Sequence, residues 1–123
     1  MAATIPVADG SGEPDFDRAH LDHFTMQDQS LALEVVGLFL GQLPASLARL
    51  EAASTAADWQ FAAHSLKGAA AAVGARRLSE IAAGLEDAAF PESPMARDGH
   101  LKTVQAAAEA FRLAARQAFP ALS

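Results

Sequence analysis

Three residues, His64, Lys67 and Gly68, have types and a spacing that suit phosphoryl transfer. The imidazole of a histidine is largely neutral near physiological pH, and in that state it is a nucleophile. Lys67 follows at i+3, so on a helix its ammonium lies near the imidazole and can offset the negative charge of a phosphoryl group. A phosphoryl group on His64, with Lys67 offsetting its charge, is therefore one hypothesis, and an ordinary surface or partly buried histidine on an alanine-rich helix is the other.

Helical periodicity predicts that His64 faces away from the core. A helix over residues 58–74 carries an apolar stripe within roughly 60° of one direction. On the same wheel His64 lies about 160° from Leu66, which belongs to that stripe. The stripe that we expect to face the core consists of Trp59, Ala62, Ala63, Leu66, Ala69, Ala70 and Val73.

The outward face of this helix is unusually bare. A glycine costs up to about 1 kcal/mol relative to alanine in a helix interior, so Gly68 needs a reason. Its missing side chain leaves the imidazole open to another molecule, and Ala71 extends the flat approach. We assign a partner-docking face to Gln60, Phe61, Gly68 and Ala71.

The sequence around His64 resembles the histidine-containing phosphotransfer (HPt) domains. The run from Ala63 to Gly68 is similar to the His-x-Leu-Lys-Gly motif of that family, and Gly74-Ala75, Leu78 and Leu85-Glu86 are similar to the segments that follow it. Members often have serine just after the glycine, where this chain has Ala69 and Ala70. That departure removes a hydroxyl and leaves the nucleophile in place.

The resemblance implies a phosphoryl carrier without kinase activity of its own. His64 would accept the phosphoryl group at Nε2 from an aspartyl phosphate on a receiver domain and pass it to an aspartate on another. The implied partners are response-regulator receiver domains and a hybrid histidine kinase. The receiver would supply Mg²⁺, and the chain itself would need no tightly bound cofactor.

Length and composition limit the other possibilities. A chain of 123 residues is one domain, too short to hold a nucleotide-binding kinase domain as well. A net charge of −6 disfavours nucleic acid and anionic membrane surfaces as partners. The chain has no cysteine, and its first residues lack the pattern of a secretory signal. We expect a cytoplasmic monomer.

The apolar pattern predicts an all-α fold, an up-and-down antiparallel four-helix bundle with a short additional helix at the N-terminal end. Residues 1–14 should form a flexible tail before a domain over residues 15–120. Pro44 should kink or break the second helix near residues 41–43, and Asp58 should cap the helix of His64. The helices are expected at about residues 17–24, 28–53, 58–74, 75–89 and 95–119.

Three alternatives to a monomeric phosphoryl carrier remain. A helical adaptor could bind its partner through the His64 face without phosphoryl chemistry. A metal-binding or hydrolytic bundle could use several histidines, such as His20 and His23 at i and i+3, although no third ligand is near in the sequence. A dimeric histidine phosphotransferase is a third arrangement, although a four-helix bundle buries its core as a monomer.

Overall fold

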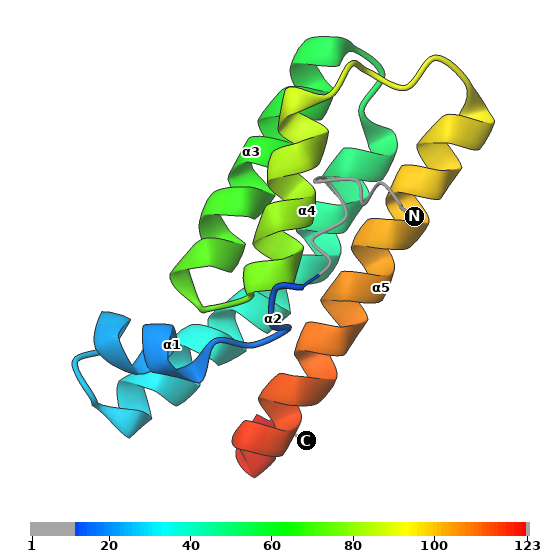
Figure 1. The fold of residues 1–123 in the computed structure, drawn as a ribbon. Helices are drawn as coiled ribbons and strands as arrows, with labels where there is room; N and C mark the ends of the chain where they lie inside the picture. Colours follow the sequence, from blue (N-terminus) through cyan, green and yellow to red (C-terminus); the bar gives the residue numbers. More distant parts are fainter. Residues whose placement is uncertain (1–11, 123) are drawn as a thin grey trace.

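The computed structural model describes residues 12–122, and all regular structure in that range is helical (Figure 1). The short α1 is followed by four longer helices and a final 3₁₀ turn, η2. The helix bounds are α1 Arg18–Phe24, α2 Gln29–Ala52, α3 Ala56–Ala72, α4 Arg76–Asp87, α5 Pro94–Ala118 and η2 Pro120–Leu122. The expected all-α class is confirmed.

The four longer helices pack around one core. Helix α3 contacts α2 and α4, and α5 contacts the same two helices from the other side. Figure 1 shows α3 and α4 side by side, with α1 set against the end of the group where α2 begins. Phe111 of α5 is fully buried, and its ring packs edge to face on the ring of Phe39 with 5.4 Å between the ring centroids.

Capping residues define the two ends of α2. The side chain of Asp28 accepts a hydrogen bond from the backbone N–H of Leu31, as expected for an N-cap. At the other end the guanidinium of Arg97, from α5, donates to the carbonyls of Leu50, Glu51 and Ala53. The Leu50 carbonyl also accepts a hydrogen bond from the backbone N–H of Ala53, so the arginine adds to this C-cap and ties α5 to the end of α2.

Helix α2 continues without a break through Pro44, which lies at an exposed position. The predicted break near residues 41–43 is therefore wrong, while a kink there stays a prediction. A proline interrupts the hydrogen bonds of one turn only, and the packing of apolar residues on both sides of it stabilises the helix. Val36, Phe39, Leu43 and Leu50 supply that packing, since all four are buried.

By length and composition, α2 is also apolar enough to cross a membrane. Core helices of globular proteins meet the same criterion, and one such helix is weak support for a membrane span.

Helix α3 begins earlier than predicted because Thr55, not Asp58, is its N-cap. The Thr55 hydroxyl accepts a hydrogen bond from the backbone N–H of Asp58 at 3.1 Å. Asp58 lies in the first turn, where its negative charge is favourable near the positive end of the helix dipole.

Gly74 ends the α3 region in the left-handed conformation, as predicted, with φ of 80°. The backbone N–H of Asp17 donates to the Gly74 carbonyl at 2.7 Å. A Cβ at residue 74 would lie 2.5 Å from the carbonyl oxygen of Asp17, so only glycine allows the two backbones to approach this closely.

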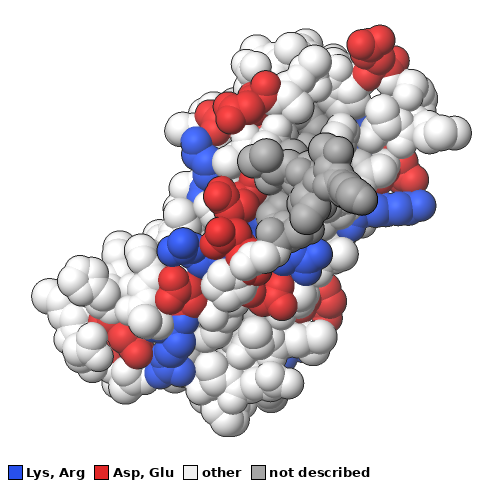
Figure 2. Space-filling model, in the orientation of Figure 1, with Lys and Arg blue, Asp and Glu red and all other residues white. Residues whose placement is uncertain are grey.

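The segment before α1 is attached to the start of α4. Arg76 forms ion pairs with Glu13 and Asp17, and Arg77 pairs with Asp15. Figure 2 shows acidic and basic side chains interspersed on this face. Most of the tail predicted for residues 1–14 lies outside the described residues, but Glu13 and Pro14 at its end contact α4.

Candidate functional site

Helix α3 presents His64 to solvent, with its side chain 63% exposed. Trp59 and Leu66, on the opposite side of the same helix, are almost completely buried. All four residues assigned from the sequence to the docking face are exposed as well. They are Gln60, Phe61, Gly68 and Ala71.

Glu86 of α4 holds one ring nitrogen of His64. The Nδ1 atom lies 2.7 Å from Oε2 of Glu86. An ionised carboxylate only accepts hydrogen bonds, so in the neutral imidazole Nδ1 carries the hydrogen and donates it. The lone pair is then on Nε2, and no residue between 12 and 122 hydrogen-bonds to that atom. This arrangement directs the nucleophilic nitrogen outward.

Lys67 contacts the other oxygen of the same carboxylate. Its Nζ lies 2.6 Å from Oε1 of Glu86, so Glu86 joins the lysine to the histidine. The hydrogen bond with Lys67, followed by the contact with His64, lowers the pKa of Glu86. The carboxylate in turn raises the pKa of Lys67. The sequence predicted an ammonium near the imidazole, and the structure adds the ion pair of that ammonium with Glu86.

The close contact between α3 and α4 places Glu86 at this site. Leu78, Ile81 and Leu85 bury the inner face of α4. On the side of α4 toward α3, the Ser79 hydroxyl donates to the carbonyl of Lys67 at 3.2 Å. Glu86 lies two turns further along on that side. In the sequence, Glu86 belongs to a segment that is similar to the HPt domains, but no pattern there assigns it to the site.

Gly68 borders open space. No atom lies within 4 Å of the position that a Cβ on residue 68 would take. Packing within the described structure therefore gives no reason for a glycine in the middle of α3. The cost of a helical glycine is consistent with a need for access from outside the molecule.

The histidines do not gather with other ligands into a metal site within residues 12–122. In that range, no three His, Asp or Glu side chains lie close enough together to hold a metal ion. His20 lines a small polar cavity with Arg76 and Glu80, and His100 packs against the ring of Trp59. His64 is the histidine that combines exposure with a carboxylate partner.

The family model of the Hpt domain matches residues 34–119, which is more than half of the chain. No curated protein and no solved structure matched. The matched range contains His64, Lys67 and Glu86 together with α3, α4 and α5. The chain belongs to the Hpt domain family.

Proposed function

We propose that this protein carries phosphoryl groups between receiver domains in a two-component phosphorelay. His64 accepts the group from an aspartyl phosphate on one receiver and passes it to an aspartate on another. The observation that carries the proposal is the exposed His64 ring, whose Nδ1 is held by Glu86 so that Nε2 is free to react. Membership of the Hpt domain family supports it.

The forward step forms one bond and breaks one. The Nε2 lone pair attacks phosphorus, the P–N bond forms, and the bond from phosphorus to the aspartyl oxygen breaks. The electron pair of the broken bond leaves with the receiver carboxylate. Because Nδ1 keeps its hydrogen, the phosphorylated ring is cationic, and the Glu86 carboxylate at 2.7 Å stabilises it.

The same cationic ring favours onward transfer. When the phosphorylated ring is cationic, the leaving group is a neutral imidazole. A neutral phosphorylated ring would have to release an imidazolate anion, which is a poorer leaving group. When a second receiver aspartate attacks phosphorus, the P–N bond breaks and the electrons return to Nε2. Glu86 thus orients the ring before the reaction and stabilises its charge afterwards, as the aspartate of a catalytic triad does for its histidine.

Lys67 has two roles in this proposal. Its contact with Glu86 lowers the pKa of that carboxyl and so favours the ionised form, which only accepts from Nδ1. Its ammonium also supplies positive charge near the phosphoryl oxygens. The receiver brings Mg²⁺, so the carrier needs no cofactor of its own. In this proposal the protein only relays phosphoryl groups and has no autonomous kinase activity.

We further infer a cytoplasmic monomer in which α2, α3, α4 and α5 form an up-and-down antiparallel bundle. The contacts of each longer helix with two others support that arrangement. A hybrid histidine kinase would supply the phosphoryl group at the start of the relay.

The test is phosphorylation by a receiver charged with phosphate. The wild-type protein should acquire phosphate that is labile in acid and stable in alkali, as phosphohistidine is, and His64→Gln should acquire none. Equal labelling of both proteins would refute the proposal. If His64→Ala kept the full signalling output in cells, the protein would instead be a helical adaptor that uses the same face.

A further inference from the structure

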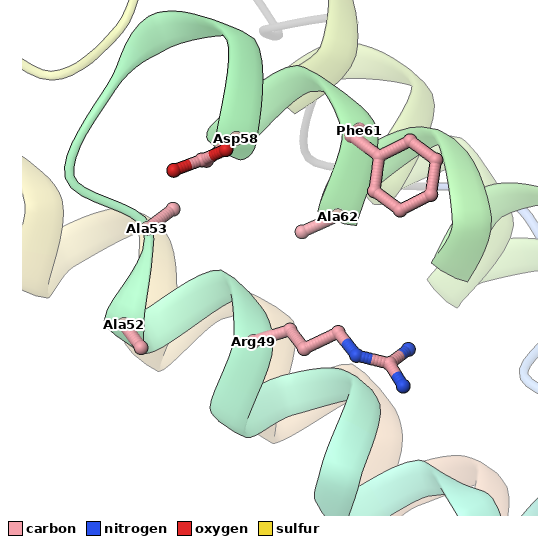
Figure 3. A pocket seen from close by; sticks show the side chains of 6 residues that line it. All are labelled: Arg49, Ala52, Ala53, Asp58, Phe61 and Ala62. Atoms are coloured by element: carbon pink, nitrogen blue, oxygen red, sulfur yellow. The ribbon is translucent and has the colours of Figure 1, made fainter.

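A cavity opens between the end of α2 and the start of α3 (Figure 3). Its volume is about 270 Å³, and it is lined by Arg49, Ala52, Ala53, Asp58, Phe61 and Ala62. Sites for drug-sized ligands have volumes from roughly 300 Å³ upward, so this cavity better fits one large side chain than a cofactor. We refer to these six residues as the α2–α3 pocket.

The floor of the pocket is apolar and its edge is aromatic. Ala53 and Ala62 are 5% exposed, whereas the Phe61 residue at the edge is 67% exposed. Figure 3 shows the Phe61 ring beside the cavity and the side chains of Arg49 and Asp58 at separate edges. An aromatic residue and an arginine around a small apolar cavity match the composition of energetic centres in protein interfaces.

Arg49 is one of two basic residues whose side chains form neither an ion pair nor a hydrogen bond within residues 12–122. The other basic side chains in that range pair with carboxylates or donate to oxygen atoms of the chain. The second unpaired arginine, Arg116, lies on α5. In a chain with net charge −6, an exposed unpaired arginine beside a cavity favours a partner that carries a carboxylate there.

The pocket is continuous with the proposed receiver-docking face. Phe61 precedes His64 by three residues on α3, so the two side chains are neighbours on the exposed surface of the helix. A receiver that reaches Nε2 of His64 therefore covers the edge of the pocket as well. The pocket lies on the α2 side of His64, and Glu86 lies on the α4 side.

We propose that the α2–α3 pocket selects the receiver domain by accepting one of its apolar side chains, with a neighbouring carboxylate of the receiver paired to Arg49. Asp58 at the other edge repels a carboxylate, so it favours one orientation of the receiver on the pocket. This inference rests on the proposed function, because it assumes that the docking partner is a receiver.

The first test is a charge reversal with a matched control. Arg49→Glu and Arg116→Glu change the net charge equally, and both original residues are exposed and unpaired in the described structure. We expect Arg49→Glu to raise the Kd for a receiver domain that phosphorylates the wild type by about tenfold or more, mainly through slower association. Arg116→Glu should change that Kd less than twofold.

The second test fills the pocket. Ala52→Trp places a large side chain in the cavity, and Ala106→Trp places one at an exposed position on α5. Ala52→Trp should weaken receiver binding, whereas Ala106→Trp should not. At saturating receiver, the single-turnover rate of transfer should return to the wild-type value for both pocket variants, because the reacting groups are unchanged. Circular dichroism checks that each variant is helical.

The outcomes separate the two proposals. If no receiver transfers phosphate to wild-type His64, both the proposed function and this inference are wrong. If transfer occurs but the pocket variants bind as their controls do, only the pocket inference is wrong. The paired carboxylate would be supported if Arg49→Glu binds the receiver weakly and if the Kd of this variant depends much less on salt concentration than that of the wild type.

Discussion

The Nδ1 atom of His64 lies 2.7 Å from Oε2 of Glu86, while the second oxygen of that carboxylate lies 2.6 Å from Nζ of Lys67. The three side chains come from two helices, α3 and α4, and only the histidine is mostly exposed. One carboxylate therefore orients the reactive ring and anchors the nearest cation.

Removing Glu86 should change the tautomer of His64 and slow phosphoryl transfer. Without the carboxylate, the hydrogen of the neutral ring is free to sit on Nε2, which then has no lone pair to react. We expect Glu86→Ala to lower the transfer rate about tenfold or more. Glu86→Gln should retain part of the rate, since its amide oxygen still accepts from Nδ1. Nitrogen NMR of the imidazole reports the tautomer, and an unchanged tautomer with an unchanged rate would contradict the role of Glu86.

Lys67→Met should raise the pKa of Glu86 in the folded protein. The lysine holds that pKa below its ordinary value, so their interaction stabilises the fold above the ordinary carboxyl pKa. That stabilisation is lost as the pH falls through the lowered pKa of the folded state. A carboxyl-carbon NMR titration should place the Glu86 midpoint at higher pH in the variant. We also expect a shorter phosphohistidine lifetime, and no change in either quantity would remove Lys67 from the mechanism.

Gly68→Gln should give a more stable protein that transfers phosphate less well. Glutamine is a better helix former than glycine by about 0.5–1 kcal/mol, and the space at residue 68 is open. The new side chain would stand one turn after His64, in the path of the receiver. Gly99→Gln is the control, because Gly99 of α5 also borders open space. Stability should rise in both variants, and receiver binding should weaken only in the first. Equal binding would show that Gly68 does not provide access.

Gly74→Ala should destabilise the fold by about 1–3 kcal/mol. Residue 74 has a positive φ, and its Cβ would meet the backbone of Asp17 at 2.5 Å. Urea unfolding measures the effect. Gly99→Ala, in an unstrained helix, should be neutral or stabilising by up to about 1 kcal/mol. A Gly74→Ala protein as stable as the wild type would show that the two segments move apart without cost.

The fold class and the outward phase of His64 could be predicted from the sequence because both depend on local periodicity. Leu66 and Trp59 define the buried side of α3, so the exposed side follows from helix geometry alone. The start of α3 was harder to predict. Thr55 and Asp58 are both good capping residues, and a shift of one turn keeps the apolar stripe intact.

The role of Glu86 could not be predicted by the same reasoning. Its position on α4 is at the border between the buried and exposed sides, where either flank could face a neighbouring helix. Which flank faces α3 depends on how the two helices pack after the turn at Gly74, and periodicity within one helix carries no such information. His64 and Glu86 are 22 positions apart in the sequence, and they come together only once that turn is in place.

The attachment of residues 13–17 to α4 has a practical consequence for protein preparation. The family match begins at residue 34, yet Leu21 is fully buried and the ring of Phe16 meets Phe111 edge to face at 5.3 Å. A fragment trimmed to the matched range would expose apolar core surface and leave Arg76 and Arg77 without their acidic partners. A fragment that folds without aggregating therefore needs residues that precede the range matched by the family model.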